Sequence, residues 1–222
     1  MEKEIWRLRL RFGRGEEVKF ISHLDIVRFW ERTFRRAGIP LAYSQGFTPH
    51  PRISVAAPLP VGVTSEAELM DIWLNRWMPP QSIMMMVKNQ LPGGFDIFDA
   101  WGVGLNIPSL QSSLAFAEYR SEVRSEKDRQ WVKDSIYSLI QAKELPWHHY
   151  RGTKIHSYDL RALIDNLWVI DSYDSLYVLG MRLRCDANSS GRPEQVVAAL
   201  GFSRYPESIH RTKLTLKGEL GS

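Results

Sequence analysis

The sequence predicts an α+β fold with two tandem domains, and three observations support this prediction. The length of 222 residues suits one large domain or two small ones, because single domains commonly contain about 100–150 residues. The first half shows apolar alternation typical of strands, interrupted by two segments with helical periodicity. The second half repeats this order of elements less regularly. The order is β-α-β-β-α-β, so the sequence predicts two tandem ferredoxin-like domains.

The N-terminal domain is expected at residues 1–102 and begins with a basic strand. Residues 5–11 alternate between apolar and basic side chains, which predicts a half-buried strand whose exposed face is basic. The apolar positions are Trp6, Leu8 and Leu10, and the basic ones are Arg7, Arg9 and Arg11. Further strands are expected at residues 41–44, 53–57, 70–74 and 95–100, and a second helix from Pro79 to about Gln90.

The first helix has clear start and stop signals. Ser22 is a good N-cap, and Asp25 places a carboxylate at the positive end of the helix dipole. Gly38 supplies the stop, and Pro40 prevents the helix from resuming. One side of this helix is apolar: Ile26, Val27, Trp30, Phe34 and Ala37. The other side, the arginine face, consists of Arg28, Arg32, Arg35 and Arg36.

Residues 103–113 carry no periodicity and are expected to be a linker to a C-terminal domain at residues 114–222. That domain should contain a strand at 114–124, a helix at 127–143, and extended segments around 147–156 and 176–184. The intervening SYDLRALIDNL segment is expected to form a helical turn or a short insertion. A helix from Pro193 to about Leu200 and a strand at 210–217 complete the order.

Composition restricts the class of protein. The formal net charge is only +4, but residues 1–60 contain eleven Lys and Arg against six Asp and Glu, so the positive excess lies in the N-terminal domain. With Cys185 as the single cysteine, no disulfide and no cysteine cluster for zinc or iron–sulfur is expected within the chain. No signal peptide and no apolar run of the ~18 residues needed for a membrane span are apparent. A cytoplasmic protein is expected.

The segment FISHLDIVRFWERTFRRAGIPLAYSQGFTPHPRISVAAPLPVGVTSEAE, residues 20–68, resembles the signature of the radical-SAM-linked protein family. This is a domain of unknown function found beside, or fused to, a radical SAM enzyme. YDLRALI at 158–164, RPEQVVAALG at 192–201 and HRTKL at 210–214 extend the resemblance over nearly the whole chain. The resemblance implies a partner radical SAM enzyme that carries S-adenosylmethionine and an iron–sulfur cluster. This chain lacks the clustered cysteines for such a cluster, so no cofactor is expected in it, and it would be an accessory or substrate-presenting subunit.

The arginine face has two interpretations. It could be an ordinary solvated helix surface, partly neutralised by Glu31 beside Arg32 and four residues before Arg35. Four guanidinium groups on one face could also bind phosphates through forked hydrogen bonds and counterion release. Because a basic strand and an aromatic loop accompany this face, the sequence favours the second interpretation.

The loop after the helix contains side chains that could contact a nucleotide. Glycine and two prolines would suffice for a rigid turn, which is the alternative interpretation, but a turn requires neither an aromatic ring nor an imidazole. An exposed Phe47 could stack on a base, Gln45 could contact a base edge, and His50 could donate to a phosphate. The predicted RNA-binding residues are Arg28, Arg32, Arg35, Arg36, Ser44, Gln45, Gly46, Phe47, His50 and Arg52.

The sequence therefore predicts an RNA-binding accessory protein of a radical SAM enzyme that presents structured RNA, such as tRNA or rRNA, with no preference for DNA and no membrane partner. One alternative is an assembly module that docks on the enzyme without nucleic acid. Another is a metal-independent endoribonuclease, which requires His23 and His50 to converge. For His23 alone, a structural role beside the helix start is favoured.

Other motifs favour structural roles. His148, His149 and His156 do not suggest a metal site, because adjacent residues of an extended segment point to opposite faces. The methionines at positions 84–86 are expected to face the core, although an exposed patch could dock a partner. Asp159, Arg161 and Arg211 are expected to stabilise the second domain, through an internal Asp–Arg pair.

Overall fold

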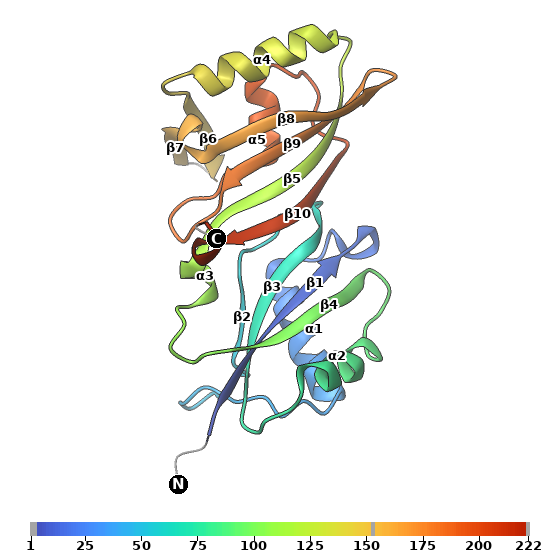
Figure 1. Cartoon of the computed structure of the whole chain (residues 1–222), viewed down its shortest axis with the longest axis vertical. Helices are drawn as coiled ribbons and strands as arrows, with labels where there is room; N and C mark the ends of the chain where they lie inside the picture. The colour runs from blue at the N-terminus through green and yellow to red at the C-terminus, as the bar shows by residue number, and fades with distance from the viewer. Residues whose placement is uncertain (1–3, 152–153, 221–222) are drawn as a thin grey trace. The chain divides into compact units, whose positions relative to one another are not determined.

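The computed structural model describes residues 4–151 and 154–220, and the chain divides into two compact units, Met1–Leu114 and Ala115–Ser222 (Figure 1). Each unit combines a mostly antiparallel sheet with a few helices, so the mixed composition that the sequence predicts is confirmed. None of the described helices is long and apolar enough to cross a membrane.

The elements of the first unit follow the predicted order. They are β1 (Trp6–Arg14), a 3-10 helix (Glu16–Val18), α1 (His23–Arg36), β2 (Ile53–Val55), β3 (Thr64–Leu74), α2 (Pro80–Lys88), β4 (Phe95–Val103) and the short α3 (Leu110–Ser113). The strands lie in the order β4-β1-β3-β2, and each neighbouring pair is antiparallel. The central strand β1 therefore has a paired strand on both sides.

The core of this unit lies between one face of the sheet and the helices α1 and α2. Leu8, Leu10 and Phe12 of β1 point into it and are buried, as the alternation predicts. They meet the apolar side of α1, where the rings of Phe12 and Trp30 pack edge to face with centroids 4.9 Å apart. Burying a side chain of this kind stabilises the fold by ~1.5–3 kcal/mol.

The opposite face of β1 is not the exposed basic surface that the sequence predicts. Arg7 and Arg9 are buried, and both bind the fully buried carboxylate of Asp71 on β3, with the closest nitrogen–oxygen distances at 2.6 and 2.7 Å. The prediction is wrong for these two residues because a covering segment excludes water from them. Among the three strand arginines, only Arg11 is exposed, with its guanidinium 5.2 Å from the centroid of the Phe98 ring.

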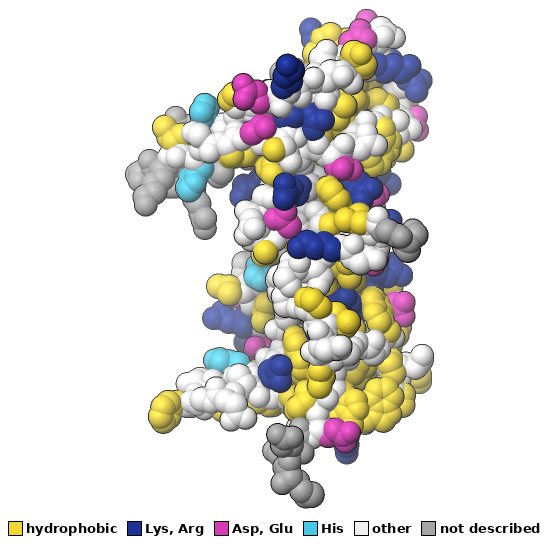
Figure 2. Space-filling view, turned by 60° about the vertical axis from the view of Figure 1, so that its left-hand side comes forward, with side chains coloured by type: hydrophobic (Ala, Val, Ile, Leu, Met, Phe, Trp, Pro, Cys, Tyr) yellow, Lys and Arg dark blue, Asp and Glu magenta, His cyan; other side chains and the backbone are white. Residues whose placement is uncertain are grey.

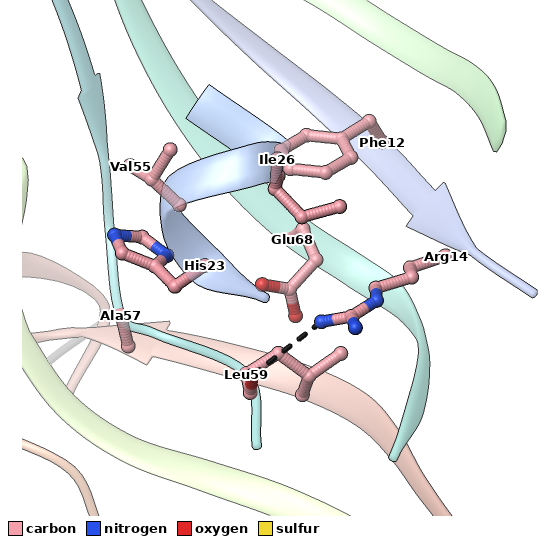
Figure 3. Close-up of a pocket in the computed structure, with 8 residues that line it drawn as sticks. All are labelled: Phe12, Arg14, His23, Ile26, Val55, Ala57, Leu59 and Glu68. Carbon is pink, nitrogen blue, oxygen red and sulfur yellow. Dashed lines mark hydrogen bonds between the residues drawn. The ribbon is translucent and has the colours of Figure 1, made fainter. Parts of the chain in front are cut away.

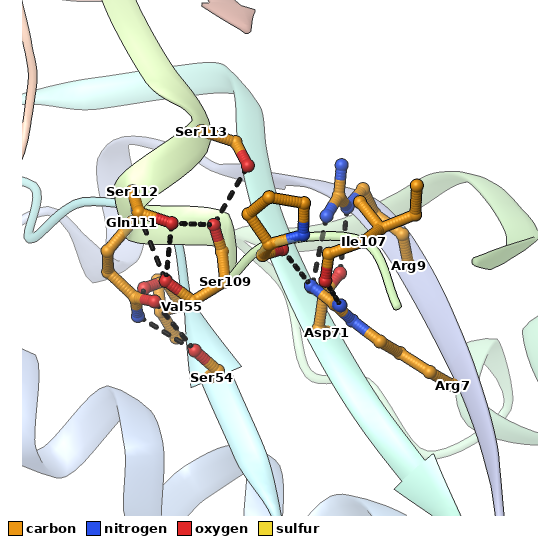
Figure 4. A network of polar contacts seen from close by, with 11 residues as sticks. Arg7, Arg9, Ser54, Val55, Asp71, Ile107, Ser109, Gln111, Ser112 and Ser113 are labelled. Atoms are coloured by element: carbon orange, nitrogen blue, oxygen red, sulfur yellow. Dashed lines mark hydrogen bonds and ion pairs between the residues drawn. The ribbon is translucent and has the colours of Figure 1, made fainter. Parts of the chain in front are cut away.

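Residues 104–113 form this covering segment (Figure 4). Arg7 donates to the carbonyl oxygens of Ile107 and Pro108 at 2.6 and 2.9 Å. Farther along, the amide of Gln111 donates to the hydroxyl of Ser54 at 2.7 Å and to the carbonyl of Val55 at 2.6 Å. The segment that lacks periodicity in the sequence is thus held to β1 and β2 by side-chain hydrogen bonds.

The predicted signals at both ends of α1 are confirmed. The hydroxyl of Ser22 accepts a hydrogen bond from the backbone N–H of Asp25 at 3.3 Å. At the other end Gly38 has φ of +68°, and the N–H of Ile39 reaches the carbonyl of Phe34 at 3.0 Å, which closes the last turn. The strand predicted at residues 41–44 is reduced to isolated bridges, Leu41 to Leu74 and Tyr43 to Pro51.

The second unit contains β5 (Leu114–Arg124), α4 (Arg129–Gln141), β6 (Pro146–Arg151), β7 (Lys154–Asp159), a 3-10 helix (Arg161–Leu163), β8 (Ile164–Tyr173), β9 (Leu176–Arg184), α5 (Pro193–Ala199), β10 (Ser208–Leu216) and a final 3-10 helix (Lys217–Glu219). Its main sheet has the order β10-β5-β9-β8, and β6 and β7 form a separate hairpin. The prediction for SYDLRALIDNL is partly wrong, because only Arg161–Leu163 is helical and β8 follows directly.

Candidate nucleic-acid interface

The arginine face of α1 is exposed, as its helical spacing predicts. Arg28 makes a long contact with Asp25 at 3.5 Å, and Arg36 lies 3.5 Å from the hydroxyl of Thr33. Within the described part of the chain, Arg32 and Arg35 have no ion-pair partner, so the neutralisation by Glu31 that the alternative interpretation requires does not occur. These two guanidinium groups keep all their donors available to a ligand.

The loop at residues 44–51, which we call the Phe47 loop, is a closed hairpin loop. The backbone N–H of Ser44 donates to the carbonyl of His50 at 2.9 Å, and the N–H of His50 donates to the hydroxyl of Ser44 at 3.0 Å. Gly46 has φ of +131°, a conformation that favours glycine, and marks the turn. Two of the predicted binding residues, Ser44 and Gly46, therefore shape the loop.

The predicted contact side chains of this loop face solvent. Gln45 and His50 are exposed, and the ring of Phe47 is fully exposed. A large apolar side chain that packs on nothing contributes nothing to the stability of the turn, so the rigid-turn interpretation explains the backbone of the loop but not this ring. Single exposed apolar residues are common on protein surfaces, and the position of Phe47 becomes informative through its neighbours.

Arg52 lies at the base of the Phe47 loop and is held by β3. Its guanidinium lies 4.8 Å from the centroid of the Trp73 ring. The backbone N–H of Trp73 donates to the carbonyl of Arg52 at 3.1 Å, and the N–H of Arg52 donates to the carbonyl of Ala42 at 2.8 Å. Sequence reasoning missed Trp73, because no local signal connects it with a loop twenty residues earlier. It also missed Tyr43, whose ring is 52% exposed at the same base.

His23 is half-buried and lines a small pocket of the first unit (Figure 3). The cavity volume is about 10 Å³, about the space of one water molecule. Its lining is Phe12, Arg14, His23, Ile26, Val55, Ala57, Leu59 and Glu68. Arg14 donates to the backbone carbonyls of Val18, Lys19, Ile21 and Leu59. The pocket is therefore bounded by buried charged groups as well as apolar side chains.

Burial lowers the pKa of His23 below its ordinary value of 6.5; the carboxylate of Glu68 acts to raise it, and the guanidinium of Arg14 lowers it further. The ring is therefore neutral at physiological pH. His50 lies on the exposed Phe47 loop and does not line this pocket. The structure thus places the two histidines in different surroundings.

In the second unit, the side chains of Asp159 and Arg161 form hydrogen bonds with backbone groups of the same unit. Asp159 accepts hydrogen bonds from the N–H groups of Leu145 and Arg161, and Arg161 donates to the carbonyls of Ile140 and Ile164. Both residues stabilise the unit, but through backbone groups and not through the predicted Asp–Arg pair. Arg211 is buried, with its guanidinium 5.7 Å from the centroid of the Tyr119 ring.

The histidines of this unit lie at the β6–β7 hairpin. The ring nitrogen Nδ1 of His148 lies 2.9 Å from the hydroxyl of Ser157, and His156 is exposed. The side chain of His149 lies outside the described residues. Among the residues that the structure describes, no group of three or more His, Cys, Asp or Glu side chains could hold a metal ion. In the first unit, the predicted core position of the methionines at 84–86 is confirmed only for Met84, which packs against the core, whereas Met85 and Met86 are exposed.

Lys and Arg side chains are spread over the face shown in Figure 2 and mix with acidic ones. The distribution of charge on this face therefore does not define an interface. What distinguishes the candidate site is local: residues 32–65 contain no Asp or Glu, while they contain Arg32, Arg35, Arg36 and Arg52. A polyanion would meet no repulsive carboxylate from this stretch of chain.

A family model described as "Uncharacterized protein conserved in bacteria (DUF2344)" matches residues 7–193. The chain belongs to this family. No curated protein sequence matches it. The match covers the arginine face, the Phe47 loop and the YDLRALI segment at residues 158–164. The candidate site therefore lies entirely within the family's domain.

Chains in two solved structures are similar to this chain. A chain in a crystal structure of a Cbf5-Nop10-Gar1 complex is similar over 93% of this chain and 48% of that chain, with 7% identity and a TM-score of 0.53. A chain in a structure of an H/ACA RNP bound to a substrate RNA containing 2'-deoxyuridine is similar over 93% of this chain and 46% of that chain, with 8% identity and a TM-score of 0.48. The present chain thus spans about half the length of the chains it matches. At 7% identity, the first likeness shows the fold alone.

Proposed function

We propose that this protein is an RNA-binding accessory protein of a radical SAM enzyme and presents structured RNA, such as tRNA or rRNA, for modification. The partner enzyme, and not this chain, would supply S-adenosylmethionine and the iron–sulfur cluster. We also propose that the two units are tandem ferredoxin-like domains, since both sheets can be described by the same strand order once the β6–β7 hairpin is regarded as an insertion.

One observation supports RNA binding most directly. Arg32 and Arg35 are exposed on α1 without ion-pair partners among the described residues, in a stretch of 34 residues without a carboxylate that also contains the exposed ring of Phe47. Unneutralised guanidinium groups bind phosphates, and an exposed ring can stack on a base. A nucleic acid has both phosphates and bases, so it could bind the guanidinium groups and the ring of Phe47 at the same time.

The residues would have distinct roles. The arginine face would hold the sugar–phosphate backbone, which positions an RNA without reading its sequence. Gln45, Phe47 and His50 would contact a nucleotide, and Arg52 would add a positive charge at the base of the loop. Ser44 and Gly46 would act indirectly, by closing and shaping the Phe47 loop.

The test is salt-dependent binding of total cellular RNA, measured by filter binding or anisotropy. We expect binding at low salt and a loss of several-fold or more when Arg32 and Arg35 are both replaced by Glu. The matched control replaces Arg129 and Lys133, two exposed residues of α4, by Glu, which changes the net charge equally. No binding at low salt, or equal losses in the two double variants, would contradict the proposal.

A second candidate is an assembly module that docks on the radical SAM enzyme without nucleic acid. The exposed Phe47 favours it, because a protruding aromatic ring could fill a pocket of a partner protein. Copurification of the two proteins after ribonuclease treatment separates the candidates. A complex that survives this treatment and is lost in Arg32→Glu/Arg35→Glu would support docking through the arginine face.

The third candidate, a metal-independent endoribonuclease, predicts cleavage of RNA in EDTA that is lost in His23→Ala or His50→Ala. His50 does not line the pocket that contains His23, and this pocket has space for about one water molecule, which is too little for a nucleotide. We therefore rank this candidate last.

A further inference from the structure

The Phe47 loop also indicates which part of an RNA it would contact. We infer that the site takes an unpaired nucleotide, in a bulge, a loop or a single strand, and that the base of this nucleotide stacks on the ring of Phe47. This inference rests on the proposed RNA-binding function and adds the class of RNA and the residue that distinguishes it.

The loop presents the ring in a defined position. Three contacts close its base: the two Ser44–His50 hydrogen bonds at 2.9 and 3.0 Å and the antiparallel bridge from Tyr43 to Pro51. Only residues 45–49 project beyond this closure. Pro49 restricts the backbone within the tip, and Arg52, just past the closure, is bound to β3 through Trp73. A preorganised loop loses little conformational entropy when a ligand binds.

Both faces of the Phe47 ring are available, because the side chain is fully exposed. A base could stack on either face without displacing any side chain of the protein. Stacking on an aromatic side chain contributes to single-strand binding by any of the four bases, since each has a π face. The ring would therefore select for an accessible base and not for a particular sequence.

A base paired in the interior of a duplex cannot meet this ring. Away from the duplex ends, each base is covered on both faces by its neighbours, and the major groove of A-form RNA is too deep and narrow for side chains to reach the base edges. An unpaired base can leave the stack and place its face on an aromatic ring. The arginine face requires only phosphates, which duplex and single strand both supply.

A pocket of a partner protein could also receive Phe47, but the charges favour RNA. Residues 32–65, which include the whole loop and its flanks, contain four arginines and no carboxylate. Arg52 adds a further positive charge at the base of the loop. A base attached to a phosphate backbone complements both the ring and these charges.

The experiment compares three fluorescently labelled RNAs: a blunt duplex, the same duplex with one bulged nucleotide, and an unstructured single strand of the same length. Their dissociation constants are measured by anisotropy at about 50 mM salt, where phosphate contacts are strong. The wild-type chain is compared with Phe47→Leu, which keeps an apolar side chain, and with Phe47→Trp, which keeps an aromatic ring. Phe20→Leu is the matched control, because Phe20 is 72% exposed elsewhere in the same unit.

We expect the wild-type protein to bind the bulged duplex and the single strand about tenfold more tightly than the blunt duplex, within the range measured for loss of one base–aromatic stack. Phe47→Leu should lose this preference and keep its affinity for the blunt duplex, whereas Phe47→Trp and Phe20→Leu should retain the preference. Equal wild-type affinities for all three RNAs, or a preference unchanged in Phe47→Leu, would overturn the inference and leave RNA binding intact. No binding of any of the three would instead contradict the proposed function.

Discussion

The guanidinium of Arg52 lies 4.8 Å from the centroid of the Trp73 ring. The two residues are joined again through their backbones, where the N–H of Trp73 donates to the carbonyl of Arg52. This contact connects the base of the Phe47 loop with the sheet. A solvent-exposed arginine loses side-chain freedom when it binds a phosphate, and a ring that already holds the guanidinium reduces this cost.

Replacing Trp73 by Leu should therefore weaken RNA binding about two- to fivefold, because an exposed cation–π contact contributes ~0.5–1 kcal/mol. Anisotropy with a single-stranded RNA measures the effect. In an Arg52→Ala background the same replacement should have no further effect, since the contact is already lost. Trp101→Leu, at a partly exposed tryptophan of β4, is the control and should bind as the wild type does. Additive losses in the double variant would contradict the coupling.

Asp71→Asn should destabilise the protein by roughly 3–5 kcal/mol, because it leaves two buried guanidinium groups without a compensating charge. Urea unfolding followed by tryptophan fluorescence measures the change. The comparison is Asp96→Asn, which removes a solvent-exposed ion pair with Lys88 and should cost less than about 1 kcal/mol. Similar losses in the two variants would show that Arg7 and Arg9 are not buried as described.

The stability of the protein should decrease as the pH falls below about 6.5. The pKa of His23 is lowered in the folded protein, so between 6.5 and that lower value the unfolded chain binds a proton that the folded one does not. Unfolding free energies measured between pH 8 and pH 5 should show this slope, and His23→Gln should reduce it. Ser22→Ala removes the neighbouring helix cap without removing a titratable group, so its effect should be the same at every pH in this range.

The Asp186 carboxylate should stabilise the second unit except in strong acid. Burial acts to raise its pKa, but hydrogen bonds from Arg184, from the N–H groups of Asn188 and Ser189 and from the Ser189 hydroxyl outweigh it and place the pKa at about 2. A lowered carboxyl pKa stabilises the fold above the ordinary value of 3.8, and this contribution is lost as the pH falls toward 2. Asp186→Asn should cost roughly 1 kcal/mol at pH 7. The difference in unfolding free energy between this variant and the wild type should shrink as the pH is lowered from about 4 through about 2.

The elements of the first unit could be predicted because their signals are local. The cap at Ser22, the stop at Gly38 and the spacing of Ile26, Trp30 and Phe34 all lie within one helix. What could not be predicted is which face of β1 water reaches. Alternation separates Arg7 from Leu8, but the carboxylate that pairs with Arg7 lies 64 residues later, and the covering carbonyls lie about 100 residues later.

The elements of the second unit are harder to predict from the sequence, because β-bulges interrupt the alternation of apolar and polar residues in the β8–β9 pair. The pairing of β8 with β9 shifts register between Ile164 and Asn166 and again between Val169 and Asp171, so the period of two never extends over the whole strand. The turn between them places Asp174 and Ser175 at positive φ, where glycine or asparagine would have signalled a hairpin. For the candidate site, the loop that carries Phe47 follows from local composition, whereas the contact of Trp73 with Arg52 at the base of this loop requires the tertiary structure.

The covering segment at residues 104–113 has a practical consequence for dissecting the protein. A fragment that ended at Gly102 would remove the carbonyls of Ile107 and Pro108 and the amide of Gln111, and would open the Arg7–Asp71 pair to water. Such a fragment would expose polar groups that the intact chain buries, and it would be susceptible to proteolysis and aggregation for reasons unrelated to RNA. A fragment that ends at Leu114, the boundary of the first compact unit, keeps all of these bonds.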